Sequence, residues 1–318
     1  MAVPSVHLRN LLLLTLDSFP YEAEYASRFY KLYLPGDGQP HGYMVSAVIE
    51  KMPWTADFIV DKDHKTVRLE DRSNGDDTSR ACTAAFSELV ERCIQQDTFA
   101  VIHGAHSEPF AILGAPYPVQ IERFAAPLFG IVSRGAHLTA YTTTGSGMEI
   151  WVARRNLASH TYPGMLDTTV AGGVAAFETP FENIVHEADE EASLPAALVQ
   201  ADARAVGVLS YMSISSKGGA SAGDHGLIIP DTAYVFDIEV SSDVKCVPKD
   251  HEVKEFYLMS VEEIKGALLR EEFKTNSAVV MVDCMVRHGI ITSENDYDYL
   301  EIAMRTHRTL PLKTARSS

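Results

Sequence analysis

The sequence of 318 residues is poor in cysteine and has no long apolar run. Its four cysteines are scattered without a CxxC pair, which argues against a disulfide framework or a zinc site and indicates free thiols in a reducing compartment: Cys82, Cys93, Cys246 and Cys284. No stretch approaches the ~20 apolar residues of a membrane-spanning helix, so we predict no membrane partner. The short apolar run at 11–14 lacks a basic leader and a cleavage site, which predicts a cytoplasmic protein without a secretory signal.

Basic residues are also scarce, with 27 Lys and Arg against 43 Asp and Glu and a formal net charge of −16. This balance predicts no nucleic-acid partner, because a polyanion needs a basic surface. A small phosphorylated ligand is still compatible with the acidity, since bound metal ions can supply positive charge. A composition of 46% apolar and 22% charged residues is typical of globular proteins, and the length predicts roughly two domains. The sequence does not define an oligomeric state.

The first part of the chain predicts a small α+β domain over residues 1–133. Helical spacing predicts helices at 5–16 and 78–95. β-branched and aromatic residues predict strands at 30–34, 43–49, 58–60 and 66–69, with shorter ones near 99–102 and 110–113. His103 and His106 are interpreted as part of a plain loop, because Gly104 lies between them and a third metal ligand is missing.

The second part, residues 134–318, predicts a mixed sheet with helices packed on it. Strands are expected at 138–144 and 148–153, joined as a hairpin at 145–147, and at 166–171, 206–212, 234–238 and 255–259. Helices are expected at 261–271 and 276–288. The glycine-rich segment 217–223 is not followed by a helix, so we interpret it as a surface loop, with a mobile lid as the alternative. The predicted fold class of the whole chain is α+β.

An acidic helix stands out at residues 180–192. Thr179, Pro180 and Glu182 form a helix start with a capping box. At about 100° per residue, Glu187, Glu190 and Glu191 lie in one adjacent stripe about 100° wide. Like charges so close together destabilise a surface helix, whereas hard carboxylate oxygens suit Mg²⁺ or Mn²⁺. The sequence therefore predicts a metal site on this helix.

The segment resembles the signature of the Nudix hydrolases, Gly-x5-Glu-x7-Arg-Glu-U-x-Glu-Glu-x-Gly-U, in which U is aliphatic. The positions in register are Gly172, Glu178, Glu187, Glu190, Glu191 and Leu194. The resemblance implies metal ligation by Glu187, Glu190 and Glu191, and the glycine pair that starts at Gly172 would let a backbone carbonyl complete the shell. It also implies a mixed sheet between helices and the hydrolysis of a diphosphate.

Two positions depart from the signature. His186 stands where the family has arginine, and a histidine paired with Glu178 keeps a hydrogen bond but loses the bidentate fork. Ser193 stands where the family has a helix-ending glycine, which predicts a modest cost. Because the metal ligands are retained, an active enzyme is expected. The alternative is an impaired Nudix domain that binds its ligand without turnover.

The chain also resembles one eukaryotic subfamily, related to thiamine pyrophosphokinase, that carries an extra N-terminal domain. The segments that carry this resemblance are 129–131, 151–155, 162–167 and 273–276. It implies a diphosphatase that converts thiamine diphosphate and its oxidised oxo- and oxy- forms to monophosphates. A nucleotide-linked diphosphate such as ADP-ribose or NADH is the alternative substrate, and an isomerase on the same fold is a more distant one.

Three further residues are candidates for the site. Family members often take the general base from a late loop, and here Glu252 is preferred, with an exposed turn acid as the alternative. Arg154 and Lys274 are candidate contacts for the substrate phosphates, and each is also compatible with a plain surface charge. The small-molecule diphosphate is the predicted partner.

Overall fold

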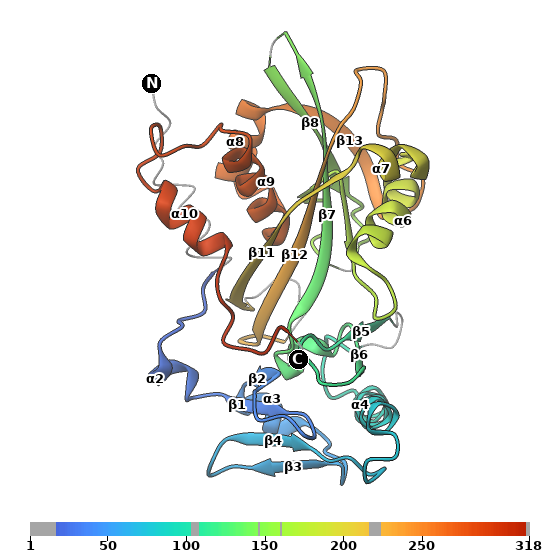
Figure 1. Cartoon of the computed structure of the whole chain (residues 1–318), viewed down its shortest axis with the longest axis vertical. Helices are drawn as coiled ribbons and strands as arrows, with labels where there is room; N and C mark the ends of the chain where they lie inside the picture. Colours follow the sequence, from blue (N-terminus) through green and yellow to red (C-terminus); the bar gives the residue numbers. More distant parts are fainter. Residues whose placement is uncertain (1–16, 103–107, 146, 160, 216–223, 316–318) are drawn as a thin grey trace.

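The computed structural model describes residues 17–102, 108–145, 147–159, 161–215 and 224–315 (Figure 1). The predicted helix at 5–16, His103 and His106, and the segment 217–223 lie outside these residues. The four cysteines are free and buried. No helix among the described residues is long and apolar enough to cross a membrane.

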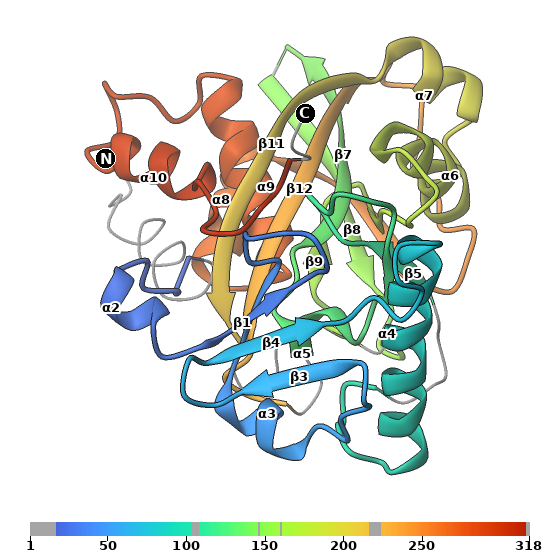
Figure 2. The ribbon, with the colours of Figure 1, turned by 60° about the horizontal axis from the view of Figure 1, so that its bottom comes forward.

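The first part of the chain forms a four-stranded sheet in the order β2-β1-β4-β3. Its strands are β1 (Tyr30–Tyr33), β2 (Gly42–Met44), β3 (Phe58–Asp61) and β4 (Thr66–Leu69), and β1 and β4 are parallel. Helix α4 (Thr78–Gln95) starts at the N-cap Asp77 and buries Phe86, which meets Phe58 of β3 with ring centroids 5.5 Å apart. The sheet crosses the lower end of the molecule (Figures 1 and 2).

Most of the elements predicted in this part are present, and helix α4 has the predicted bounds. The strand expected at 43–49 is wrong beyond Met44, because helix α3 (Ser46–Lys51) follows and buries Val48 and Ile49; packing overrides their β propensity. The strand expected at 99–102 is also wrong, since this segment is a turn with buried apolar side chains. The smaller elements are α2 (Ala23–Ala26), β5 (Pro109–Ala111), β6 (Gln120–Glu122) and α5 (Ala126–Phe129).

The second part is built on a seven-stranded mixed sheet. Its path runs β11-β12-β7-β8-β13, with β10 paired to β7 and β9 paired to β8. The strands are β7 (Ser133–Thr144), β8 (Gly147–Arg155), β9 (Leu166–Asp167), β10 (Val170–Gly173), β11 (Arg204–Ile214), β12 (Ile228–Glu239) and β13 (Val253–Ser260). Strands β7 and β8 are antiparallel up to Thr144 and Gly147, as the predicted hairpin requires. The parallel pairing of β12 with β7 makes the sheet mixed, and the predicted α+β class is confirmed.

Helices cover both faces of this sheet (Figure 1). On one face lie α6 (Pro180–Ala192) and α7 (Ala196–Asp202), which share a core with β7, β10 and β12. On the other lie α8 (Val261–Leu269) and α9 (Thr275–Arg287), with α10 (Tyr299–Thr306) beside α9 and β11. The helices predicted at 261–271 and 276–288 are confirmed as α8 and α9. The acidic helix α6 therefore lies on the opposite face of the sheet from α8 and α9.

The two parts are packed against each other. A cluster that includes Phe19, Tyr43, Met212 and Ile228 joins the N-terminal sheet to the near ends of β11 and β12. The segment after α10 returns to the same end, where the Lys313 Nζ atom lies 2.6 Å from an Asp37 oxygen. The division of the chain between residues 133 and 134 stays a prediction.

Candidate active site and metal centre

Helix α6 begins as its sequence predicts. The Thr179 hydroxyl accepts a hydrogen bond from the Glu182 amide at 3.2 Å, and the Glu182 carboxylate accepts one from the Thr179 amide at 2.9 Å. The buried face holds Ile184, Val185, Ala188 and Ala192, which fix the rotation of the helix on the sheet. This rotation buries Glu191 at the edge of the apolar face and leaves Glu190 exposed.

The three glutamates of the stripe differ in their environment. Glu191 is 4% exposed and accepts a hydrogen bond from the Ala171 amide of β10 at 3.1 Å. Glu187 is partly buried, and Glu190 is exposed. Burial raises the pKa of Glu191 well above its ordinary value, and the charge of Glu187 raises it further. The three predicted metal ligands thus range from a buried carboxylate, Glu191, to a solvent-exposed one, Glu190.

Glu187 lies directly against Gly172. A Cβ atom on Gly172 would come within 2.3 Å of the Glu187 Oε1 atom and 2.6 Å of its Cγ atom, so only glycine fits here. Burial, together with the nearby carboxylates of Glu252 and Glu190, raises the pKa of Glu187 to about 8. Gly172, the predicted backbone ligand, therefore lies against Glu187, a predicted carboxylate ligand.

Glu252 lies in the loop before β13, and its charge acts on both Glu187 and Glu191. The loop is held to β8 by a 2.8 Å hydrogen bond from the Asn156 amide to the Glu252 carbonyl. The exposed carboxylate is therefore near the acidic helix, although 60 residues separate it from Glu191 along the chain. Its role as the general base stays a prediction.

Glu178 holds the loop between β10 and α6 against the helix. One of its oxygens is 2.7 Å from the His186 Nδ1 atom, and the other accepts a hydrogen bond from the Asn183 Nδ2 atom at 3.0 Å. Asn183 also donates to the Gly173 carbonyl at 3.0 Å. His186 thus makes the contact that the signature arginine would make, with a single nitrogen.

Sequence reasoning missed a contribution from the N-terminal region. The β5–β6 hairpin lies below α6, and the Ala176 amide of the signature loop donates to the Pro109 carbonyl of β5 at 2.8 Å (Figure 1). Directly after β6, the guanidinium of Arg123 packs on Gly173 and pairs with Glu108 at 2.8 Å. No local pattern marks Arg123, because its place depends on how two distant parts of the chain pack together.

The candidate phosphate contacts are engaged elsewhere in the fold. The Arg154 guanidinium donates to the Tyr257 hydroxyl at 3.1 Å and to the Gly164 carbonyl at 2.9 Å. The Lys274 Nζ atom lies 3.3 Å from Asp167, which is buried. The structure does not bring either of them into contact with the α6 glutamates, and their role toward phosphate stays a prediction.

Three of the four segments that resemble the thiamine-related subfamily meet around Asp167. Arg155 and Lys274 each lie 3.3 Å from its carboxylate, and the Thr275 hydroxyl donates to Tyr162 at 2.7 Å. Burial opposes ionisation of Asp167, but Lys274 and Arg155 hold its pKa down to about 2. Asp167 in turn raises the pKa of Glu191, so this cluster lies behind the acidic helix.

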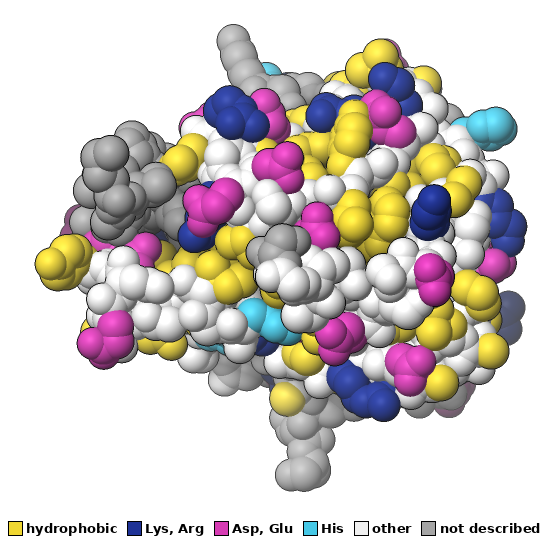
Figure 3. Space-filling model, turned by 90° about the horizontal axis from the view of Figure 1, so that it is seen from above, with side chains coloured by type: hydrophobic (Ala, Val, Ile, Leu, Met, Phe, Trp, Pro, Cys, Tyr) yellow, Lys and Arg dark blue, Asp and Glu magenta, His cyan; other side chains and the backbone are white. Residues whose placement is uncertain are grey.

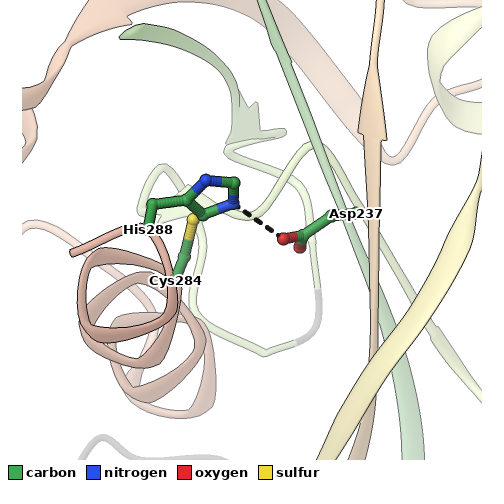
Figure 4. Close-up of side chains that lie close together, drawn as sticks. All are labelled: Asp237, Cys284 and His288. Carbon is green, nitrogen blue, oxygen red and sulfur yellow. Dashed lines mark hydrogen bonds and ion pairs between the residues drawn. The ribbon is translucent and has the colours of Figure 1, made fainter.

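A second group of potential metal ligands lies on the other face of the sheet. Asp237, Cys284 and His288 offer ligand atoms within 4.8 Å of one another (Figure 4). Asp237 and His288 border a hollow of about 480 Å³, which Arg287 also lines. Arg287 already pairs with Asp237, and burial raises the pKa of the Cys284 thiol to about 12. The cluster is therefore better explained as an ion-pair network.

The α6 glutamates fit a divalent cation by their chemistry. Their side chains are not gathered as closely as those of the Asp237 group in the described part of the chain, as expected for like charges on one helix. Burial and the charges of Glu252 and Glu190 raise the pKa of Glu187, and a divalent cation bound there would offset both effects. All the side-chain donors are hard oxygens, which suit Mg²⁺ or Mn²⁺.

Comparison with known proteins gives relatives for most of the chain. An uncharacterised protein of Saccharomyces cerevisiae, YJR142W, is 30% identical over 285 residues, which cover 87% of this chain and 83% of the relative. Nudix hydrolase 20, chloroplastic, of Arabidopsis thaliana is 32% identical over 209 residues, which cover 64% of this chain and 53% of the relative. The chain thus spans about half the length of this plant relative. No protein-family model matches the chain.

Among solved structures, the NUDIX domain of Shewanella oneidensis NrtR, complexed with ADP ribose, is similar at 10% identity with a TM-score of 0.37. The match covers 48% of this chain and 86% of that chain.

The predicted cytoplasmic location stays a prediction. The face of the molecule seen from above mixes acidic and basic side chains (Figure 3), and the lack of a nucleic-acid partner also stays a prediction.

Proposed function

The chain belongs to the Nudix hydrolase family, with an extra region before the Nudix fold, and from this premise we propose that it hydrolyses thiamine diphosphate and its oxidised oxo- and oxy- derivatives to monophosphates. The observation that carries the proposal is a group of four carboxylates in which Glu187 lies against Gly172 and interacts with the charges of the other three, Glu190, Glu191 and Glu252. Two of them have raised pKa values because burial and like charges oppose their ionisation.

In this mechanism, Glu187, Glu190 and Glu191 would hold Mg²⁺ or Mn²⁺ on one side of α6. The cation would supply positive charge to the diphosphate and lower the pKa of the attacking water. The contact of Glu178 with His186 and Asn183 keeps the signature loop against the helix. Gly172 leaves the room in which the Glu187 carboxylate lies.

The chemical step transfers a phosphoryl group to water. The water oxygen forms a bond to one phosphorus, the bond from that phosphorus to the bridging oxygen breaks, and Glu252 accepts the water proton. The products are thiamine monophosphate and inorganic phosphate. Glu252 is suited to this role because it is exposed yet close enough to act on Glu187 and Glu191.

Two features support a thiamine-type substrate. The segments that resemble the thiamine-related subfamily assemble around Asp167 behind the acidic helix. In addition, Phe177, which precedes Glu178 in the signature loop, is 80% exposed. An exposed aromatic ring in the signature loop suits a cationic thiazolium ring.

A substrate panel tests this function. With Mg²⁺, the purified protein is expected to release phosphate from oxothiamine diphosphate faster than it cleaves ADP-ribose, NADH or coenzyme A. The reverse order would reassign the substrate within the same chemistry. If no diphosphate is cleaved but one raises the melting temperature, the protein binds its ligand without turnover.

The metal assignment is tested on the same helix. Glu191→Gln is expected to abolish turnover, because it removes the charge of the buried carboxylate while keeping an oxygen for the Ala171 amide. Asp189→Asn is the matched control, since Asp189 is half-exposed on α6 and pairs with Lys249 at 2.6 Å. Undiminished activity of Glu191→Gln would refute the metal site.

A further inference from the structure

Resting on the proposed function, we propose that Arg123 of the N-terminal region binds the diphosphate of the substrate at the metal site. Arg123 follows β6, the second strand of the short hairpin that lies below α6. The N-terminal region would therefore contribute a side chain to the active site.

The position of Arg123 is fixed by two contacts. A Cβ atom on Gly173 would lie 2.9 Å from the Arg123 Cζ atom, so the guanidinium packs directly on the backbone next to Gly172. The guanidinium also lies 5.5 Å from the centre of the Phe110 ring, which packs on Gly173 as well. Glu187 lies against Gly172, the preceding residue of β10. The side chains of Arg123 and Glu187 therefore pack on consecutive glycines, and the charge of Arg123 acts on Glu187.

The charge and exposure of Arg123 fit a phosphate. Its positive charge acts on Glu187, where the other nearby charges are carboxylates. The structure pairs its Nη1 atom with Glu108 at 2.8 Å, and 44% of its side chain is exposed. A guanidinium has five N–H donors in a planar fork, which matches the oxygens of a phosphate.

Glu108 explains how an arginine so close to a cation site is kept in place. Besides the side-chain ion pair, the Arg123 amide donates to the Glu108 carbonyl at 2.9 Å across the hairpin. The hairpin is in turn held to the signature loop by the bond between Ala176 and Pro109. The fork is thus positioned before a substrate arrives, which limits the entropy lost on binding.

The test uses the full-length protein and two probes. The first is steady-state hydrolysis of thiamine diphosphate with saturating Mg²⁺. The second is calorimetric binding of methylenediphosphonate with Mg²⁺, because its P–C–P bond is not hydrolysed. Arg123→Met keeps an unbranched side chain to pack on Gly173, and Arg123→Lys keeps the charge without the fork.

Arg123→Met is expected to weaken methylenediphosphonate binding and raise the KM about ten- to hundredfold, the usual loss for a charged hydrogen bond. Arg123→Lys is expected to fall between it and the wild type. Arg92→Ala is the matched control, with 44% of the side chain exposed and a single 2.7 Å pair with Glu88 on α4, and it is expected to change neither value.

Manganese binding separates this role from a structural one. Loss of a neighbouring positive charge is expected to leave the Mn²⁺ affinity of Arg123→Met unchanged or tighter. A parallel loss of Mn²⁺ and diphosphate binding in Arg123→Met would show that Arg123 only holds the hairpin. Wild-type diphosphate binding by Arg123→Met would also overturn the proposal.

The outcomes also distinguish this proposal from the proposed function. If the wild type binds methylenediphosphonate but does not cleave thiamine diphosphate, the substrate is wrong, and the Arg123 variants still test the diphosphate contact. If the wild type binds no diphosphate in the presence of Mg²⁺, both proposals are overturned.

Discussion

Gly172→Ala is the change whose effect can be worked out most directly from the structure. The added Cβ atom would lie 2.3 Å from the Glu187 Oε1 atom, 2.6 Å from its Cγ atom and 2.7 Å from the Asn183 Oδ1 atom. Carbon contacts are normally about 3.5–4.0 Å, so the Glu187 side chain must retreat by roughly 1 Å. The retreat moves a predicted metal ligand without changing any charge.

Two consequences are expected for Gly172→Ala. Overpacking typically costs about 1–3 kcal/mol, and the unfolding free energy is expected to fall by that amount. Misplacement of a catalytic group by about 1 Å can cost a hundredfold in rate, so hydrolysis of thiamine diphosphate is expected to fall by about that factor. Urea denaturation and the Mg²⁺-dependent assay measure these two effects, and a Mn²⁺ titration shows whether metal affinity falls with them.

Gly135→Ala is the matched control on the neighbouring strand. Gly135 faces Gly173 across the β7–β10 pair, and a Cβ atom there would meet nothing closer than the Gly172 carbonyl oxygen at 3.7 Å. That is an ordinary contact, and the variant is expected to keep its activity and Mn²⁺ affinity. Equal losses in both variants, or normal turnover and Mn²⁺ affinity in Gly172→Ala, would refute the role assigned to the close approach.

Three further predictions follow from single contacts. His186→Arg is expected to keep or raise the hydrolysis rate. His186→Ala is expected to lower it only a few-fold, because the His186 side chain that pairs with Glu178 is 68% exposed. A loss above a hundredfold in His186→Ala would mean that the imidazole acts in the chemistry. Ser193 has a left-handed φ of 55°, and its hydroxyl donates to the Val247 carbonyl at 2.9 Å. The unfolding free energy of Ser193→Gly is therefore expected to lie within about 1 kcal/mol of the wild-type value, and Ser193→Ala is expected to be the less stable of the two variants. Urea denaturation that ranks the alanine variant above the glycine variant would contradict this. Burial lowers the pKa of His137 to about 4, so the unfolded chain takes up the proton first and stability is expected to fall as the pH drops from about 6.5 to about 4; His137→Gln is expected to flatten this fall, and unfolding curves with unchanged pH dependence would exclude His137 as the cause.

The parts of the fold that the sequence predicts well are those with strong local signals. Helix α6 begins at Thr179 because the capping box is written in three nearby residues, and helix α4 has both a helical apolar spacing and the N-cap Asp77. Local signals fail where tertiary packing decides, as in α3, where Val48 and Ile49 favour a strand and are buried in a helix. The predicted strand at 166–171 is likewise divided into β9 and β10, which pair with different neighbours.

The candidate site divides in the same way. Periodicity places Glu187, Glu190 and Glu191 in one stripe, but it cannot show that their burial differs, because that depends on how α6 sits on the sheet. Arg123 has no sequence signal, since it reaches the site through packing of the β5–β6 hairpin on the signature loop. Glu252 was expected from the family resemblance alone, and its charge does act on the acidic helix.

The unequal burial of the glutamates has a consequence for how the site works. Glu191 is fixed by the Ala171 amide in the interior, whereas Glu190 is free to follow a ligand at the surface. Donors arranged from the interior outward leave the solvent-facing side open to a diphosphate, and Arg123 is positioned beside Gly173. Because buried carboxylates without a cation carry a cost in solvation, metal and diphosphate are expected to bind more tightly together than either does alone. The N-terminal region belongs to that coupling, since the guanidinium compensates charge on the diphosphate that the metal leaves unpaired.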